Sequence, residues 1–172
     1  MINRNDEVSA LLSAYSKALD LLDDYDHDCL RRPLGKAPTY RLTYEECTEV
    51  IASMRFAGDS DLFGREKDDS FRGSIGNVYQ TFGGSELYPT LEEKAANLLY
   101  LVVKNHSFLD GNKRIAAAMF LYFLSKNHRL FTEEGEKRIS DAALAALTLM
   151  IAHSRPEEKE QMISIVINCI VP

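Results

Sequence analysis

The stretch from Asn105 to Ala118, with the sequence NHSFLDGNKRIAAA, joins two apolar helical segments through a cluster of polar residues. On the upstream side, apolar residues recur at helical spacing, at Ala95, Leu98, Leu99 and Val102. On the downstream side they do the same, at Ile115, Met119, Tyr122 and Phe123. The pair Gly111–Asn112 is typical of a point where one helix ends and another begins. We therefore predict a tight turn, carrying residues 106–114, between two buried helices.

The start of the second helix, near Gly111 or Asn112, is predicted to attract anions. The first turn of a helix has free backbone N–H groups and the positive end of the helix dipole, which together favour phosphates. Gly111 lets the backbone come close to a ligand. Lys113 and Arg114 add two cations beside that site, and the forked guanidinium suits phosphate oxygens.

Two further residues of the cluster indicate chemistry on a bound phosphate. Asp110 can hold a magnesium ion, because Mg²⁺ usually takes one or two carboxylates together with phosphate oxygens. His106 is the nearby histidine, a residue type that commonly serves as a proton acceptor. It could take the proton of an attacking hydroxyl, an effect worth roughly 10²–10⁴-fold in rate. A base, a metal carboxylate and a phosphate cradle together are typical of phosphoryl-type transfer from a nucleotide.

The run His-x-Phe-x-Asp-Gly-Asn-Lys-Arg, at residues 106–114, resembles the signature of the Fic/Doc (Fido) family. The resemblance implies ATP and Mg²⁺ as cofactors and a protein hydroxyl, of Ser or Thr, as the acceptor. It also implies a role for each matching residue: His106 as the base, Phe108 as the buried anchor of the loop, Asp110 as the metal ligand, Gly111 and Asn112 as the phosphate nest, with Lys113 beside them, and Arg114 as a phosphate contact.

Two positions depart from the pattern of Fic enzymes that transfer AMP. Position 113 is Lys, where those enzymes usually have Gly, and position 117 is Ala, where they usually have a second Arg. Both departures are similar to the Doc (death-on-curing) branch, which uses ATP in the opposite orientation and transfers a phosphate. We therefore expect phosphorylation of the target. AMP transfer is the alternative, because Gly111 follows the Fic pattern where Doc proteins usually have Ala. A catalytically inactive binding module is a second alternative.

The wider run from Phe71 to Asn127 resembles the Fido-like domain of RhuM-type virulence-associated proteins, where an N-terminal region precedes it. We expect residues 1–172 to form a single domain with its core at 71–127, either complete or as a fragment of a longer protein. Without the second Arg, self-inhibition of the Fic type is not expected. The expected regulator is an antitoxin or an N-terminal region of a longer chain.

The remaining sequence predicts a mainly α fold of six to seven helices with one small β-hairpin. Apolar periodicity predicts a helix over residues 6–25. Capping boxes at Thr43–Glu46, Thr90–Glu93 and Ser154–Glu157 open three more. A short apolar pattern predicts a helix at residues 71–79, and an alanine-rich pattern predicts one at residues 140–153. The helix that follows the motif is the last of the set. Glycine and acidic residues at 57–69, and polar residues at 127–138, indicate connecting loops.

The hairpin is predicted around a Gly-Gly turn. In Fido proteins a flap just upstream of the motif helices receives an extended segment of the target by backbone pairing. By that resemblance the target-docking flap would comprise Thr81, Phe82, Gly83, Gly84 and Ser85. An ordinary surface hairpin is the alternative.

Composition excludes several other classes. The net charge of −6 argues against direct binding to nucleic acid or to an anionic membrane surface. Three cysteines without metal-ligand spacing, and no apolar leader at the N-terminus, indicate a cytoplasmic protein. The pair His27–Asp28 suggests a metal-dependent phosphohydrolase of the HD kind, but this class needs further His and Asp ligands along helices, whereas His27 is predicted in an acidic loop.

Overall fold

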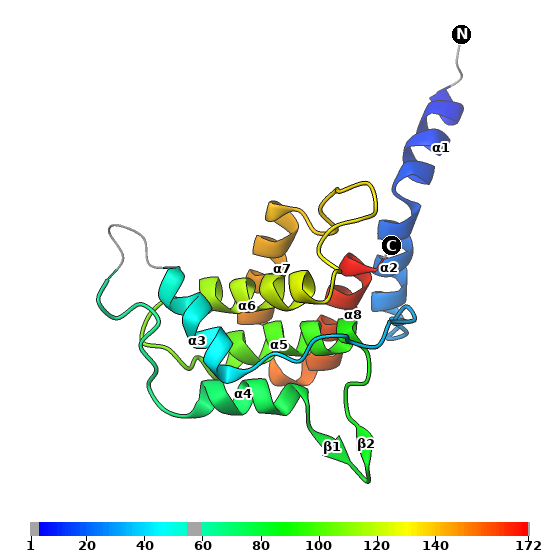
Figure 1. Cartoon of the computed structure of the whole chain (residues 1–172). Helices are drawn as coiled ribbons and strands as arrows, with labels where there is room; N and C mark the ends of the chain where they lie inside the picture. The colour runs from blue at the N-terminus through cyan, green and yellow to red at the C-terminus, as the bar shows by residue number, and fades with distance from the viewer. Residues whose placement is uncertain (1–3, 55–59, 172) are drawn as a thin grey trace. The chain divides into compact units, whose positions relative to one another are not determined.

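The computed structural model describes residues 4–54 and 60–171, and it is mainly helical (Figure 1). By their internal contacts these residues divide into two compact units, one up to Arg32 and one from Pro33 onward. No helix in the described ranges is long and apolar enough to cross a lipid bilayer. Within these ranges Cys29, Cys47 and Cys169 form no disulfide.

The first unit holds two helices, α1 (Arg4–Ala14) and α2 (Ser16–Asp26), where the sequence predicted one. The break falls at Tyr15, whose backbone angles of φ −116° and ψ 18° lie outside the helical range. The described residues therefore hold eight α-helices, so the prediction of six or seven was too low. None of the residues in α1 or α2 is buried.

The second unit carries the remaining elements and the whole polar cluster. In chain order they are α3 (Tyr44–Ser53), α4 (Ser70–Val78), β1 (Thr81–Phe82), β2 (Ser85–Glu86), α5 (Leu91–Asn105), α6 (Asn112–Lys126), α7 (Asp141–His153), the 3₁₀ turn η1 (Pro156–Glu158) and α8 (Lys159–Ile170). The short antiparallel hairpin of β1 and β2 pairs Thr81 with Glu86 and Phe82 with Ser85. The Gly-Gly turn between them has positive φ at both glycines, as predicted for such a hairpin.

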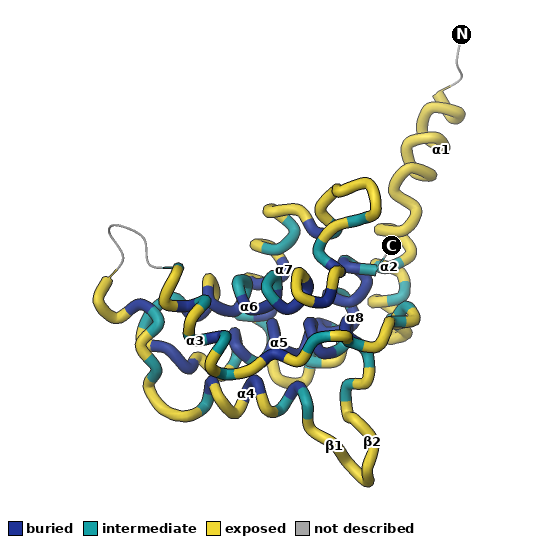
Figure 2. The backbone as a smooth tube through the Cα atoms, viewed as in Figure 1, coloured by how far each residue is buried: buried dark blue, intermediate teal, exposed yellow. Residues whose placement is uncertain are grey.

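Helix α5 lies at the centre of this unit, packed against α4, α6, α7 and α8. Eleven of its 15 residues are buried, and Figure 2 shows the buried backbone following α5 and α6. The apolar stripes read from the sequence on both sides of the motif point into this core: Leu98, Leu99 and Val102 of α5 are at most 1% exposed, as are Ile115, Met119 and Phe123 of α6. Removing these surfaces from water is the main force that holds the two helices together.

Helix starts follow the predicted capping boxes at two of three places. Thr43 and Glu46 cap α3, and Thr90 and Glu93 cap α5, each by a reciprocal pair of side-chain and backbone hydrogen bonds. The third prediction, Ser154–Glu157, was wrong. The Ser154 hydroxyl donates back to the Ile151 carbonyl of α7, and Glu158 accepts from the backbone N–H of Arg155 instead.

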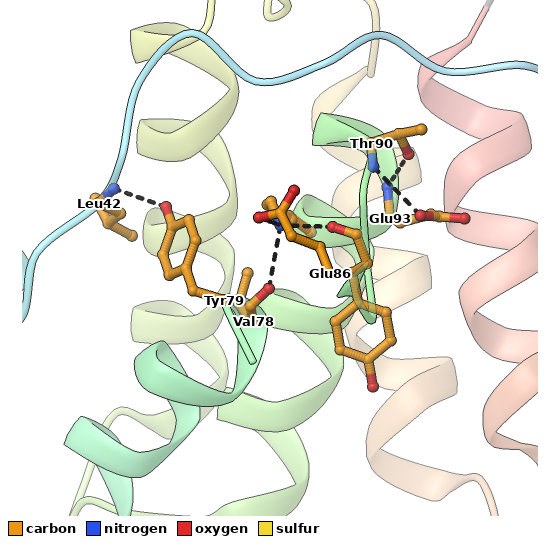
Figure 3. Close-up of polar contacts among 8 residues, drawn as sticks. Leu42, Val78, Tyr79, Glu86, Thr90 and Glu93 are labelled. Atoms are coloured by element: carbon orange, nitrogen blue, oxygen red, sulfur yellow. Dashed lines mark hydrogen bonds and ion pairs between the residues drawn. The ribbon is translucent and has the colours of Figure 1, made fainter. Parts of the chain in front are cut away.

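A buried ammonium group joins the hairpin to the start of α5. Lys94, on α5, has a side chain that is 0% exposed and donates to Glu86 of β2 at 3.0 Å. It also donates to the carbonyl oxygens of Val78 and Tyr88, which lie just before and just after the hairpin. Figure 3 shows this group of contacts beside the Thr90–Glu93 cap. Both stems of the hairpin are therefore held at the N-terminal end of α5.

Candidate active site at the bend between α5 and α6

The polar cluster lies at the C-terminal end of α5, as the sequence predicted. α5 ends at Asn105, and His106 takes a left-handed conformation with φ 49°. Gly111 precedes α6 with φ 89°, in the region that favours glycine. The first intrahelical bond of α6 runs from the Ile115 N–H to the Gly111 carbonyl at 2.9 Å. The N–H groups of the preceding first turn therefore have no acceptor within the helix.

Asn112 closes the loop that precedes α6. Its side-chain oxygen accepts from the Phe108 N–H at 2.9 Å, and its side-chain nitrogen donates to the Phe108 carbonyl at 2.8 Å. Phe108 is 1% exposed and packs edge-on against Phe71 of α4, with ring centroids 4.8 Å apart. Phe108 thus occupies the buried position expected of a loop anchor, and Asn112 fixes the backbone of the loop.

The other motif residues surround one open hollow. Its volume is about 350 Å³, and it is lined by His106, Leu109, Asp110, Gly111, Asn112, Lys113 and Arg114. His106, Lys113 and Arg114 are exposed, and Asp110 is half-exposed. The structure therefore brings the predicted base, carboxylate, cations and helix start to a single pocket. Its volume lies at the lower end of the range typical of small-molecule sites.

A segment that the sequence analysis treated as a plain loop pairs with the motif loop. Between residues 63 and 67, the Gly64 N–H donates to the Asp110 carbonyl at 3.1 Å, and the Lys67 N–H donates to the Ser107 carbonyl at 2.8 Å. The Leu109 N–H donates in return to the Arg65 carbonyl at 2.9 Å. We call residues 60–67 the backing segment.

Side chains of the backing segment contact three of the predicted site residues. The Lys67 ammonium nitrogen lies 2.8 Å from Nδ1 of His106. The Ser60 hydroxyl donates to Oδ2 of Asp110 at 3.0 Å. The ring of Phe63 lies under the guanidinium of Arg114, 4.5 Å from its centre. Sequence reasoning missed all three, because a loop without periodicity gives no signal of its distant partners.

Phe63 also explains why residue 111 is glycine. A Cβ atom at this position would lie 2.3 Å from an edge carbon of the Phe63 ring, which is closer than real Cβ contacts. Phe63 is itself only 2% exposed and cannot easily give way. Gly111 therefore meets two needs, the positive φ before α6 and the close approach of a buried ring.

The backing segment is tied to α3 as well. The Tyr44 hydroxyl donates to the Glu66 carboxylate, and this bond is the main cause that raises the pKa of Tyr44 above its ordinary value. Its ring also packs against Phe71, at 6.0 Å between centroids. The α3 helix, the backing segment and the motif loop therefore form one connected structure.

The predicted flap lies elsewhere in this unit. The hairpin with Thr81, Phe82, Gly83, Gly84 and Ser85 precedes α5, whereas His106 follows it (Figure 1). A helix of 15 residues is about 22 Å long at 1.5 Å per residue. The structure does not bring the hairpin to the motif, and its role in docking a target stays a prediction. The backing segment is the stretch that pairs with the motif loop.

Asp110 is the candidate ligand for a metal ion. Within the described ranges no group of three or more His, Cys, Asp or Glu side chains is arranged to hold one. A single carboxylate at the edge of the pocket fits Mg²⁺ only together with phosphate oxygens, which is the usual arrangement for this ion. Arg114 Nη2 lies 4.0 Å from Asp110 Oδ2, so a cation already faces this carboxylate.

The residues around this pocket lie in a stretch that is similar to known proteins. Residues 42–124 match the model of the Fic/DOC family. The protein named Toxin Doc from Mycolicibacterium smegmatis is 47% identical over 54 residues, a stretch that covers 31% of this chain and 42% of that protein. No solved structure matches the chain significantly. The matched range runs through α3, α4, α5 and α6 and includes the backing segment and the motif loop. Residues 42–124 of this chain are therefore similar to the Fic/DOC family.

Proposed function

We propose that this protein transfers a phosphate-containing group from ATP to a Ser or Thr hydroxyl of a target protein. The observation that carries the proposal is the single pocket lined by His106, Asp110 and the first turn of α6. The Fic/DOC family, whose members transfer such groups to proteins, supports it.

In this proposal the triphosphate of ATP binds against the start of α6. The N–H groups of the first turn, Lys113 and Arg114 would contact its oxygens. Asp110 would hold Mg²⁺, which neutralises phosphate charge when it is bound. Arg114 is supported from beneath by the Phe63 ring, so its guanidinium is already oriented when the nucleotide arrives.

His106 would take the proton of the attacking hydroxyl, and Lys67 lies 2.8 Å from one of its ring nitrogens. An ammonium group can only donate a hydrogen bond, so in this proposal Nδ1 would accept from Lys67 and the proton of the neutral ring would lie on Nε2. The ring would then be able to accept a proton once Lys67 moves away from Nδ1. Phosphate oxygens in the pocket are stronger acceptors than an imidazole nitrogen and would draw the ammonium away.

Phosphoryl transfer is the first choice for the reaction. Lys113 and Ala117 match the Doc branch, and the relative named Toxin Doc supports the same assignment. AMP transfer is the second choice, because Gly111 follows the Fic pattern. Gly111 is weak evidence here, because its contact with Phe63 already accounts for a glycine at this position.

The partners in this proposal are a target protein and a regulator. The backing segment is the better candidate for positioning the target, because it pairs with the loop that carries His106 and Asp110. The name of the relative suggests an antitoxin as the regulator, with an N-terminal region of a longer chain as the alternative. A cytoplasmic location is part of the same proposal.

A labelling experiment tests the proposal. The purified protein is incubated with host lysate and Mg²⁺, with ATP labelled at the α or at the γ phosphorus, and His106→Ala is run beside it. We expect label on a protein in the wild-type reaction and a loss of roughly 10²–10⁴-fold in the variant. Equal labelling by both proteins would remove His106 from the mechanism. Binding of ATP without transfer of either label would identify a non-catalytic binding module.

A further inference from the structure

The two helices of the first unit, α1 and α2, expose a stripe of large apolar side chains. Five residues recur four, three, four and three positions apart, and each is between 45% and 64% exposed: Val8, Leu12, Tyr15, Leu19 and Leu22. Neither helix has a buried residue, and Figure 2 shows α1 in the exposed colour throughout. Each helix has 11 residues, a length that is marginal in water without packing. The stripe therefore has the features of a contact surface.

The spacing of the stripe indicates the kind of contact. Alternating steps of three and four residues are typical of the seam of a coiled coil. In this pattern Leu12 and Leu19 take position a of the heptad. Val8, Tyr15 and Leu22 take position d. The break at Tyr15 does not interrupt the seam, because the N–H groups three and four residues later both donate to its carbonyl oxygen, at 3.0 and 3.1 Å.

The charges around the seam indicate which partner fits. Asp6, Asp20 and Asp24 fall at the outer heptad positions b and f. Between residues 9 and 18, the positions that flank the seam, e and g, are uncharged: Ser9, Leu11, Ser16 and Ala18. A partner selected for positive charge would need acidic residues along these flanks. A second copy of the same stripe meets no like charge there and fits the seam better.

We propose that residues 4–26 of two copies of this chain pack together along this seam as an antiparallel pair. The direction follows from the charges at its ends. Asp23 and Asp26 take positions e and a at one end, and Arg4 flanks the other end. A parallel pair would bring the two acidic ends together and repel. An antiparallel pair places each acidic end beside Arg4 of the partner subunit. This inference does not depend on the proposed reaction.

Two neighbouring residues of α1 provide a matched test of the seam. Leu12 takes position a, whereas Ser13 takes the outer position b and is also exposed. Sedimentation equilibrium measures the mass and the dissociation constant of the wild type, Leu12→Glu and Ser13→Glu. We expect a wild-type mass of twice 19.4 kDa. Leu12→Glu should weaken association at least about tenfold, because its carboxylate would be buried in the seam without a partner. Ser13→Glu should associate as the wild type does.

Leu19→Glu repeats the test in α2. Neither Leu12 nor Leu19 is part of the buried core, so neither variant should disturb the second unit, and circular dichroism checks that it remains helical. A monomeric wild type would overturn the inference. So would a dimer that both leucine variants leave unchanged, or one that Ser13→Glu weakens as much as Leu12→Glu.

An exchange of charges tests the direction of the pair. In an antiparallel pair Arg4→Glu places carboxylates together, so it should weaken association about two- to fivefold. Adding Asp26→Arg to this variant should restore the wild-type dissociation constant. Equal constants for the wild type, the single variant and the double variant would overturn the antiparallel arrangement. The labelling experiment measures the proposed function separately, so its failure is distinguishable from the failure of this inference.

Discussion

The two ends of α5 use charged residues in opposite ways. At its N-terminal end, Glu92 and Lys94 are fully buried, and each pairs with an opposite charge, Glu92 with Arg129 at 3.1 Å and Lys94 with Glu86 at 3.0 Å. At its C-terminal end, Asp110 and Arg114 are about half-exposed around an open hollow, 4.0 Å apart. Buried charges must find their partners within the protein, whereas charges around a hollow can take theirs from a ligand.

The largest loss of stability is expected at the N-terminal end of α5, where the charged side chains are buried. Lys94→Met removes an ammonium group that donates hydrogen bonds to three oxygen atoms, and these oxygens lose their donor. Glu86 is 44% exposed and can be hydrated, but the two carbonyl oxygens lose their donor, so the loss in the free energy of unfolding should be about 3–5 kcal/mol, at about 1–3 kcal/mol for each unsatisfied buried group. Urea denaturation followed by circular dichroism measures it. Lys113→Met is the matched control, an exposed lysine at the other end of the helix pair, and should stay within about 0.5 kcal/mol of the wild type. Similar losses in both variants would contradict the comparison.

A smaller loss is expected from a methyl group at the bend. Gly111→Ala forces a side chain into a left-handed conformation and against the buried Phe63 ring. Together these should cost about 2–3 kcal/mol in the free energy of unfolding. Gly83→Ala is the control, because it also has positive φ but nothing lies within 4 Å of its added Cβ. Thermal unfolding of the two variants compares them, and equal losses would remove Phe63 from the explanation.

The next effect concerns binding and leaves stability nearly unchanged. Arg114→Gln removes a cation from the wall of the pocket that contains His106. Loss of a charged hydrogen bond to phosphate, worth about 1.5–3 kcal/mol, should weaken ATP binding about tenfold or more in calorimetric titration. Arg72→Gln, on α4 and stacked on Tyr44, is the control and should bind ATP as the wild type does. If Arg114→Gln bound ATP with the wild-type affinity, Arg114 would have no role in holding the phosphates.

The smallest effect is expected for Lys67→Met. The contact between Lys67 and His106 joins two exposed side chains and contributes little stability. The contact is instead expected to determine which ring nitrogen of His106 carries the proton. Nitrogen NMR of the wild type should show the neutral His106 ring protonated at Nε2, and the variant should gain the Nδ1-protonated form. Identical tautomer populations in the two proteins would show that Lys67 does not control the ring.

The sequence predicted correctly those features whose interacting residues lie close together along the chain. The bend at Gly111, the two capping boxes and the Gly-Gly hairpin each depend on residues within about four positions of one another, so local patterns are enough. The backing segment depends on distant pairs instead. Lys67 and His106 are 39 residues apart, and Ser60 and Asp110 are 50 residues apart. No periodic pattern marks such pairs, so the loop at 57–69 gave no sign of its role.

The helix predicted over residues 6–25 is divided in the structure, because its continuous apolar stripe does not show the change of backbone angles at Tyr15. The hairpin was predicted at its place in the chain, but the sequence did not show that it and His106 lie at opposite ends of α5. The buried Glu92 and Lys94 were also missed, because charged residues in a helical pattern are normally on its solvent face.

A crystal structure of the protein with Mg²⁺ and a non-hydrolysable ATP analogue would show whether the nucleotide binds at the bend between α5 and α6. We predict the triphosphate against the first turn of α6, in contact with Lys113 and Arg114, with its terminal phosphorus beside His106. A nucleotide bound away from Gly111–Arg114, or one whose phosphates do not reach His106, would contradict it.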